Sequence, residues 1–448
     1  MSTFTLTVHF MRHSIVRDLL VLAAAAAIAP LAPAQNATFT TIPLLPGGFQ
    51  NIFDVGSAVS ADGSTVVGTS DSSLGDADAF AYTALTGGVA ALGAIESGAN
   101  YNSQARSVNQ NGTFAVGYSR KALSPFAKFR AVTWTYDGNT QVWSLTELGA
   151  AGAPAGQNGE SYAYDVSDDG AVIVGRSSGP TTASQRAYRY AGGVWTQISS
   201  VNFSEALAVS GNGQVVVGDS NDQAFRWTQG GGLTPLGFLN PTGGQASYAN
   251  DVNTDGSVVV GDSSTDSAGF SPFATEAFRW SGGVMRRLGA IPSAGAIGSS
   301  ATAVNGNGKV IVGNAIVAET FPPFTTEATV WNPRQGMRSL AAALISAEPS
   351  LEGVLSGYRL ETARSISRDG RTITGDAVAL GGGRVGFVAT LPRFCTADFN
   401  LDGQVTAQDI FDFLAAWFTA SASADVNISG TVTAQDIFDF LAAWFGGC

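Results

Sequence analysis

The sequence predicts a mainly β protein, a seven-bladed β-propeller followed by a small α-helical domain. Two observations support this prediction. A twelve-residue motif with two glycines recurs seven times between residues 57 and 375, and the fourteen-residue string VTAQDIFDFLAAWF occurs twice near the carboxyl end without a change. Seven similar units indicate a repeat architecture, and a duplicated apolar string after a polar loop indicates two equivalent helices.

The first element is a predicted signal peptide at residues 1–34. A basic segment precedes an apolar run from Leu19 to Ala32, and the small residues Ala-Pro-Ala precede Gln35. The run is short for a membrane span, so we expect cleavage after Ala34. No later segment is long and apolar enough to span a bilayer. We therefore expect a bacterial protein that is secreted or displayed at the cell surface.

Removal of this peptide restricts the chemistry of the mature chain. Both histidines, His9 and His13, lie inside it, so no histidine triad, histidine base or histidine-containing zinc site is expected. Loss of Arg12, Arg17 and Asp18 takes the formal net charge from −12 to −13. A chain this acidic is not expected to bind nucleic acid.

The second element, residues 35–392, contains the repeats. SAVSADGSTVVG at 57–68 and NDVNTDGSVVVG at 250–261 are two of the seven copies. The first glycines of the copies are spaced by 43 to 62 residues, and a second glycine follows five residues later each time. These first glycines are Gly63, Gly112, Gly170, Gly213, Gly256, Gly308 and Gly370. A period near fifty residues is typical of propeller blades.

Each unit fits four short strands. In the fifth copy, NDVNT and SVVVGDS flank an Asp-Gly turn, and EAFRW with GGVMRRLGA forms a second hairpin. The seventh copy ends at GFVATLP, one strand short, whereas FTTIPLLPGG near the start of the mature chain resembles the missing strand. Such a strand would close the ring and bury exposed sheet edges. A β-helix and two stacked sandwiches remain alternatives.

These units resemble the HAF family of extracellular repeats. The His-Ala-Phe string of that family corresponds here to DAF, QAF and EAF, and the resemblance covers roughly residues 37–391. It implies an exported, propeller-like domain without a known chemistry. Long insertions, among them SRKALSPFAKFR, IVAETFPPFTTE and AALISAEPSLEGVLSGYRLE, are the candidates for binding a glycan or a peptide.

The third element, residues 393–448, contains two acidic loops with the ligand spacing of EF-hands. DFNLDGQVTAQD and DVNISGTVTAQD place oxygen ligands at loop positions 1, 3, 5, 7, 9 and 12. The predicted ligands of two calcium ions are Asp398, Asn400, Asp402, Gln404, Thr406 and Asp409, then Asp425, Asn427, Ser429, Thr431, Thr433 and Asp436. The first loop has one more carboxylate, so we expect it to bind more tightly. An acidic turn that caps a helix is the alternative for each loop.

This element resembles the type I dockerin family, whose members have two calcium loops, each followed by a helix, and bind cohesin receptors of secreted assemblies. The family often places a hydroxylated pair at loop positions 10 and 11, where this chain has alanine and glutamine. The resemblance implies a cohesin-like or other cell-envelope receptor. The predicted partner-binding residues are Ala407, Gln408, Phe411, Ala434, Gln435 and Phe438.

The two cysteines of the chain, Cys395 and Cys448, lie at the two ends of this element. Exported proteins pair their cysteines, and domains this small often depend on such bonds. We predict a disulfide between them. The ending WFGGC is similar to a dockerin subgroup that terminates in Gly-Cys and anchors exported bacterial proteins.

Two functions fit these features. The first is an exported, non-catalytic binding or scaffold protein whose propeller is attached to a surface or assembly through its calcium-dependent module. The second is a polysaccharide hydrolase delivered by a dockerin. No pair of carboxylates has a recognisable catalytic spacing in the sequence, so we predict no catalytic residue and favour the first.

Overall fold

The computed structural model describes residues 36–48, 56–71, 77–84, 86–96, 102–122, 127–151, 159–178, 185–240, 246–265, 275–292, 296–318, 325–402 and 404–447. They form two compact units, Asn36–Phe394 and a carboxyl-terminal unit that begins at Cys395. The predicted signal peptide, Gly403 and Cys448 lie outside the described residues. No helix in the described part of the chain has the length and apolarity that crossing a bilayer requires.

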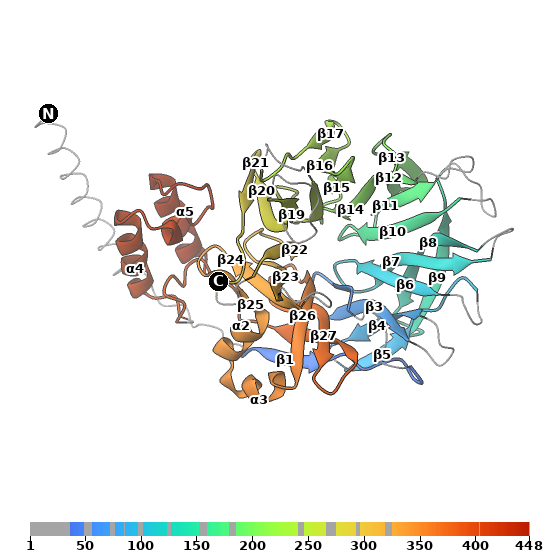
Figure 1. The fold of residues 1–448 in the computed structure, drawn as a ribbon, viewed down its shortest axis with the longest axis horizontal. Helices are drawn as coiled ribbons and strands as arrows, with labels where there is room; N and C mark the ends of the chain where they lie inside the picture. Colours follow the sequence, from blue (N-terminus) through green and yellow to red (C-terminus); the bar gives the residue numbers. More distant parts are fainter. Residues whose placement is uncertain are drawn as a thin grey trace, which may run out of the picture. The chain divides into compact units, whose positions relative to one another are not determined.

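The first unit consists of seven four-stranded antiparallel sheets, called blades 1 to 7 below (Figure 1). Blade 1 contains β2 (Ala58–Val59), β3 (Thr65–Asp71), β4 (Ala77–Thr83) and β5 (Gly88–Ala91), and blade 2 contains β6 (Ser103–Val108), β7 (Phe114–Lys121), β8 (Lys128–Asp137) and β9 (Val142–Gly149). Blade 3 contains β10 (Ser161–Val166), β11 (Val172–Ser178), β12 (Gln185–Ala191) and β13 (Val194–Gln197), and blade 4 contains β14 (Glu205–Val209), β15 (Val215–Ser220), β16 (Gln223–Thr228) and β17 (Gly232–Pro235).

Blades 5 to 7 complete the ring. Blade 5 contains β18 (Ser247–Val252), β19 (Val258–Ser264), β20 (Thr275–Ser281) and β21 (Val284–Arg287), and blade 6 contains β22 (Gly298–Val304), β23 (Ile311–Ala318), β24 (Thr325–Asn332) and β25 (Gly336–Ser339). Blade 7 contains β26 (Tyr358–Ile366), β27 (Thr372–Ala379), β28 (Arg384–Thr390) and β1 (Thr38–Thr41). The first strands of neighbouring blades contact one another around the whole ring and therefore line its axis. Blade 7 takes its outer strand, β1, from the amino end of the unit. The seven-bladed propeller is confirmed.

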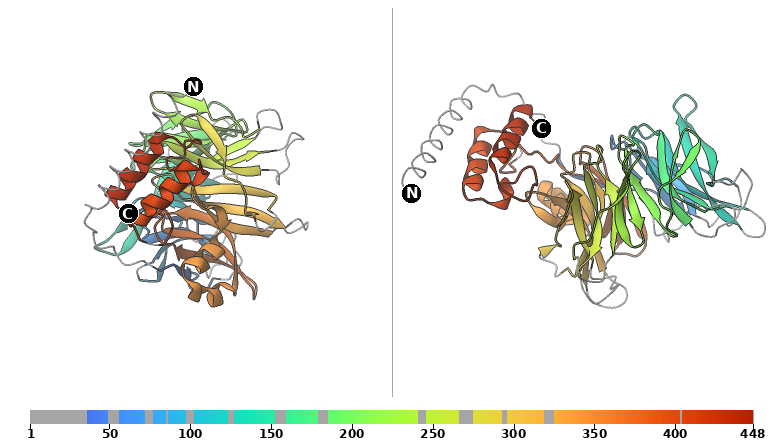
Figure 2. Two further views of the ribbon diagram at one scale, coloured as in Figure 1. Left: turned by 90° about the vertical axis from the view of Figure 1, so that its left-hand side faces the viewer. Right: turned by 90° about the horizontal axis from the view of Figure 1, so that it is seen from above.

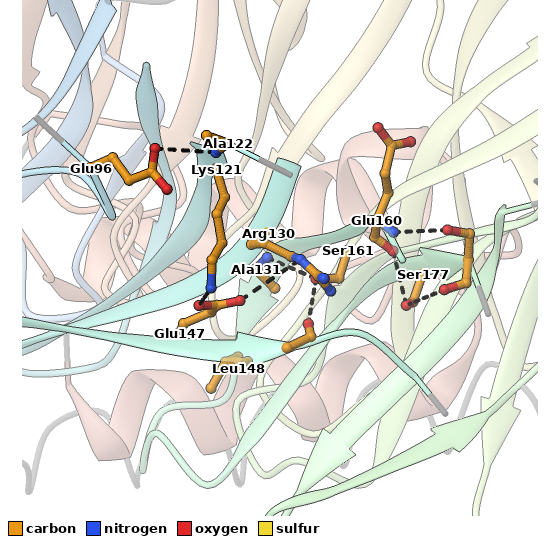
Figure 3. Close-up of polar contacts among 12 residues, drawn as sticks. Glu96, Lys121, Ala122, Arg130, Ala131, Glu147, Leu148, Glu160, Ser161 and Ser177 are labelled. Carbon is orange, nitrogen blue, oxygen red and sulfur yellow. Dashed lines mark hydrogen bonds and ion pairs between the residues drawn. The ribbon is translucent and has the colours of Figure 1, made fainter. Parts of the chain in front are cut away.

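A serine at the start of an inner strand joins each of several blades to the one before it. The Oγ of Ser161 accepts a hydrogen bond of 2.9 Å from the N–H of Ala131, as Figure 3 shows. The same bond joins Ser103 to Ala79, Ser204 to Ala187, Ser247 to Ala224, and Ser299 to Ala277. Three of these alanines belong to the DAF, QAF and EAF strings, and all five are fully buried. The recurrence of this alanine therefore has a packing cause.

The two glycines of the motif have different roles. Gly256 has φ +77°, the left-handed conformation that its turn requires. Gly261 instead lies opposite a β-bulge between Ala249 and Asp251, where a Cβ would overlap the carbonyl oxygen of Tyr248. The second glycine thus permits close approach of two strands, the use expected of glycine at a bulge.

One end of the propeller axis is closed by the seven Gly-containing turns that follow the inner strands. Backbone hydrogen bonds join Arg368 to Ala61, Asp62 to Gln110, Gln110 to Asp168, Asp168 to Gly211, Asn212 to Thr254, and Gly306 to Arg368. Inside this ring, the guanidinium of Arg368 in blade 7 forms an ion pair with Asp168 in blade 3. We call this the closed end.

The long insertion before blade 7 is mostly helical. It contains α2 (Leu340–Ala347), the 3-10 turn η2 (Pro349–Leu351) and α3 (Glu352–Leu355). Ser339 caps α2 by accepting a hydrogen bond from Ala342. Leu344 and Leu355 are buried in the core shared with blades 6 and 7. The segment packs as part of the scaffold, so it is a poor candidate for a flexible binding loop.

The carboxyl-terminal unit contains α4 (Ala407–Phe418), the 3-10 turn η3 (Ala422–Ala424) and α5 (Ala434–Gly446), and Figure 2 shows the two long helices side by side. Phe413 of α4 and Phe440 of α5 stack at 4.3 Å. The identical strings also make reciprocal contacts. Trp417 Nε1 donates to the carbonyl of Thr433, and Trp444 Nε1 donates to that of Thr406. The duplication is therefore expressed as an approximate twofold arrangement.

Candidate functional site

The first predicted calcium loop is closed by its own side-chain oxygens. The backbone N–H of Asp402 donates to Asp398 Oδ1 at 3.1 Å and to Asn400 Oδ1 at 3.0 Å. Asp402 Oδ1 in turn accepts from the N–H of Gln404 at 2.8 Å. These bonds turn the oxygens at loop positions 1 and 3 toward the middle of the loop.

The second loop repeats this geometry. The N–H of Ser429 donates to Asp425 Oδ1 at 2.8 Å and to Asn427 Oδ1 at 3.0 Å. The amide nitrogen of Asn427 donates to Asp439 Oδ2 at 2.9 Å, which fixes the amide so that its oxygen faces the loop. The carbonyl of Thr431, the predicted ligand at position 7, accepts from Ser429 Oγ at 3.0 Å.

The carboxylates at loop position 12 connect each loop to its helix. Asp409 accepts from the N–H of Phe399 and from that of Thr406, and Asp436 makes the equivalent bond to the N–H of Thr433. Both helices begin with a capping box, and both aspartates are fully buried. The capping role considered as the alternative is thus present. It is compatible with cation binding, because a carboxylate has about four lone pairs to share.

The chemistry of this unit suits a hard cation. Residues 395–448 contain seven aspartates and no lysine, arginine or histidine. Burial of a carboxylate without a cation is costly, and calcium takes six to eight oxygen ligands of this kind. No three Asp, Glu, His or Cys side chains in the described chain converge as a metal cluster would. Amide, hydroxyl and carbonyl oxygens would therefore have to complete each ligand set.

The six predicted partner-binding residues lie at corresponding positions of the two helices, and all of them are exposed: Ala407, Gln408, Phe411, Ala434, Gln435 and Phe438. The rings of Phe411 and Phe438 are 46% and 65% exposed. Phe418 and Phe445 add a second exposed pair at the ends of the helices. These exposed phenylalanines are candidates for a contact with a partner.

Cys395 is disulfide-bonded. Its predicted partner, Cys448, lies outside the described residues, so the pairing stays a prediction.

The end of the propeller axis opposite the closed end has polar and aromatic residues that the sequence analysis missed; we call it the open end. In blades 2 to 7, the inner strand has an alanine opposite the second glycine of the motif. The residue before this alanine and the residue after that glycine face each other in the sheet. The pairs are Gln104 and Tyr118, Tyr162 and Arg176, Glu205 and Asp219, Tyr248 and Asp262, Ser300 and Asn314, and Thr362 and Asp376.

Blades 2 and 3 form an aromatic part of the open end. The ring of Tyr162 lies 4.9 Å from that of Tyr118 and 5.7 Å from that of Phe129. The guanidinium of Arg176 lies 4.5 Å from the centre of the Tyr162 ring and forms an ion pair with Glu205 of blade 4. Tyrosine rings at this place therefore already hold a cation.

Blades 4 and 5 form an acidic part. Burial, helped by the nearby charges of Glu205 and Asp222, raises the pKa of Asp219 to about 7. Burial raises the pKa of Tyr248, and the charges of Asp222, Asp219 and Asp262 act in the same direction. Burial also raises the pKa of Asp262, although this carboxylate accepts hydrogen bonds from neighbouring side chains. The acids here lie close enough to disfavour one another's ionisation.

A signal for these residues was present in the repeats. The position after the second glycine varies, although the glycine before it is constant and the residue after it is always serine or alanine. The variable residues are Thr69, Tyr118, Arg176, Asp219, Asp262, Asn314 and Asp376. The blade fold does not require a particular residue at a position that varies among copies of an otherwise constant motif. The variation therefore indicates that individual blades are specialised at this position.

The insertion in blade 2 holds charges at the boundary with blade 3. Figure 3 shows Glu147 between Lys121, at 2.6 Å, and Arg130, at 3.7 Å. Arg130 is fully buried, and this burial lowers its pKa, whereas Glu147 and Glu160 act in the opposite direction. These charges neutralise one another inside the scaffold and do not resemble a catalytic pair.

No protein-family model and no curated protein matches the chain. Many solved structures are similar to it, among them the following three. TolB from Acinetobacter baumannii has 11% identity and a TM-score of 0.38, with 61% of this chain and 62% of that one covered. A putative TolB from Agrobacterium tumefaciens has 12% identity and a TM-score of 0.39, with 73% and 99% covered. A puromycin-hydrolysing peptidase from Mycobacterium tuberculosis has 13% identity and a TM-score of 0.45, with 82% and 57% covered.

The chain thus spans less than two thirds of the first of these proteins and of the peptidase. At such identities, we transfer no activity, substrate or partner from them.

Proposed function

We propose that this protein is an exported binding protein. Its propeller holds a ligand, and its carboxyl-terminal unit acts as a dockerin-like module that attaches the propeller to a cohesin-like or other cell-envelope receptor when calcium is bound. One observation supports this most strongly. Two copies of the same loop and helix form an approximate twofold unit that is rich in aspartate and free of basic side chains.

Calcium, when bound, would offset the mutual repulsion of these aspartates and hold each loop against its helix. In the first loop, the side-chain oxygens of Asp398 and Asn400 face the middle of the loop, and the carboxylate of Asp402 lies at the turn. Asp409 would contribute from the start of α4. The second loop has the same ligands with a serine in place of the third, so its affinity should be lower.

The receptor surface is proposed to be the exposed residues around Phe411 on α4 or the equivalent residues around Phe438 on α5. Exposed apolar surface that forms a patch marks a protein contact, and both phenylalanines are exposed. Because the two rings belong to identical helical strings, the module offers the same contact twice, in two orientations. The receptor can therefore bind either copy.

The test is retention of a receptor on the full chain. The immobilised protein is incubated with envelope and secreted extracts of the producing cell in calcium and is then washed with chelator. We expect one or a few proteins to be retained with calcium and released by chelator. If nothing binds while the unit is folded and loaded with calcium, the attachment role is wrong.

Hydrolysis of a polysaccharide is the second candidate, because Glu205 and Asp219 face each other across β14 and β15 and the pKa of Asp219 is raised. Glycosidases use two carboxyl groups that flank the scissile bond. Glu205, however, is held in an ion pair by Arg176, which favours binding over catalysis. Release of reducing ends from plant or microbial polysaccharides that is lost in Glu205→Gln would establish the enzyme.

A further inference from the structure

We propose that the carboxyl-terminal unit binds a basic amphipathic helix of its receptor. The apolar side of that helix contacts the exposed phenylalanines of α4 or α5, and its lysines or arginines pair with Asp412 or Asp439. The inference rests on the receptor-binding role proposed above and names the chemistry of the receptor. Two features of the unit support it, which are the spacing of the exposed residues and the charge beside them.

Each helix has one exposed row of uncharged residues, which we call its outer seam. The seam of α4 consists of Gln408, Phe411, Ala415 and Phe418, and that of α5 consists of Gln435, Phe438, Ala442 and Phe445. Residues at intervals of three, four and three positions lie along one side of a helix, and two helices pack against each other through rows with this spacing. The outer seam therefore fits a second helix.

The outer seams are not part of the core of the unit. The core is formed by the opposite side of each helix, where Phe413 and Phe440 stack. The two phenylalanines of the α4 seam are each 46% exposed, and those of the α5 seam are 65% and 58% exposed. A surface helix normally has polar residues on its outer side, so these rings indicate a side that a partner covers.

One aspartate lies beside each seam. The Oδ1 of Asp412 accepts a hydrogen bond of 2.9 Å from Nε2 of Gln408, and Asp439 accepts the same bond from Gln435. Asp439 also accepts a bond from the amide of Asn427. Since a carboxylate has about four lone pairs, each aspartate can in addition accept a hydrogen bond from a base of the partner.

The charge of the unit favours a basic partner. Residues 395–448 contain seven aspartates and no lysine, arginine or histidine, and Asp412 and Asp439 are the two aspartates outside the predicted calcium ligands. An anionic lipid surface, a nucleic acid and a second copy of the same unit would each place more negative charge beside them. A helix with lysine or arginine beside an apolar stripe matches both the charge and the spacing of the seam.

The test compares three synthetic helical peptides by calorimetry on the full chain in excess calcium. Each peptide has about 18 residues, which make about five turns of helix. The first has leucines at the spacing of the seam with lysines beside them, and the second has glutamates in place of the lysines. The third has the composition of the first in an order that forms no apolar stripe. We expect the first peptide to bind at least about tenfold more tightly than the other two.

Variants that leave one seam intact locate the contact. Phe438→Ser removes the α5 seam and leaves the α4 seam for binding. In this background, Asp412→Asn should weaken binding of the lysine peptide about threefold, the effect of one exposed ion pair, and Phe411→Ser should abolish binding. Asp137→Asn changes an exposed acid in the turn between β8 and β9 and should leave the affinity unchanged. An unfolding temperature equal to that of the background excludes a folding defect in each variant.

Equal affinity for the lysine peptide and either of the other two would overturn the proposal, as would an unchanged affinity in Asp412→Asn. A calcium-dependent dimer of the full chain that is lost in the double variant Phe411→Ser with Phe438→Ser would also overturn it and would assign the seams to a second copy.

The two proposals can fail separately. If the extracts yield a receptor while the three peptides bind equally, the attachment role stands and the basic helix is wrong. If the lysine peptide alone binds while the extracts yield no receptor, the attachment role is wrong and the chemistry of the seam stands.

Discussion

Arg368 of blade 7 forms an ion pair with Asp168 of blade 3, two blades that are not neighbours in the ring. The contact is possible because Gly211 and Gly306 lie beside it and a Cβ at Gly306 would overlap the Arg368 side chain. The ion pair therefore joins distant blades at the closed end, in addition to the hydrogen bonds between adjacent ones.

Removal of this ion pair should destabilise the propeller modestly. The side chains of Arg368 and Asp168 are 33% and 22% exposed, so solvent reduces the coupling to about 1 kcal/mol. A double-mutant cycle with Arg368→Ala and Asp168→Ala, measured by denaturant unfolding, gives this coupling directly. A coupling indistinguishable from zero would mean that the backbone ring alone holds the closed end.

The second glycine of the motif should tolerate no side chain. In Gly261→Ala, the new methyl group meets the carbonyl of Tyr248, so we expect a loss of about 2 kcal/mol or more in the free energy of unfolding. Gly230→Ala is the control, because its Cβ would enter open space at ordinary φ, and it should change stability by less than about 0.5 kcal/mol. Equal effects would refute the close-approach explanation.

The propeller should lose stability as pH rises. Burial raises the pKa of Asp165 to about 6 and that of Asp251 to about 8, both above the value of the unfolded chain. Folding therefore favours the protonated forms, and this contribution is complete below about pH 4 and is lost as pH rises through about 8.

Asp251→Asn keeps an oxygen that can accept from the N–H of Val304 and removes the titrating proton. The variant and the parent should differ less in unfolding temperature at pH 5 than at pH 8. At pH 8 the variant should unfold at the higher temperature. Thermal unfolding in chelator-free buffer measures both. A parent protein whose unfolding temperature does not fall over this range would contradict the assignment.

The receptor surface gives a prediction about redundancy. Because Phe411 and Phe438 lie at equivalent positions, Phe411→Ser or Phe438→Ser alone should leave most of the calcium-dependent retention intact, and the double variant should lose it. Surface plasmon resonance with the retained receptor measures this. The double variant Gln408→Ala with Gln435→Ala makes a smaller change at equivalent positions of both helices, because these side chains contact Asp412 and Asp439 rather than the core. If one single variant abolishes receptor binding, the receptor does not bind the module in two equivalent orientations.

Much of the fold followed from the sequence because a blade is a local structure. The turn glycines and the alternating strands of one copy are separated by few residues. The closing strand β1 lies far from β28 in the chain, and it was predicted because the last copy lacks a fourth strand. The two loops were recognised for the same reason, since all their predicted ligands lie within twelve residues of one another.

What the sequence did not reveal depends on which blades meet across the axis. Nothing in the spacing of Asp168 and Arg368 indicates that they are partners, because their pairing results from ring closure. The open end was missed for a related reason. Tyr162, Arg176 and Glu205 belong to two blades and form one cluster only after the sheets have packed.

The most direct test of the central claim is a calcium titration of the full chain by calorimetry, with Asp409→Asn and Asp436→Asn beside Asp412→Asn as the control on the same helix face. We predict two bound calcium ions in the parent and in the control, and one in each position-12 variant, with thermal stability rising on binding. Absence of saturable calcium binding by the folded parent, or two ions in all variants, would contradict the account of the carboxyl-terminal unit.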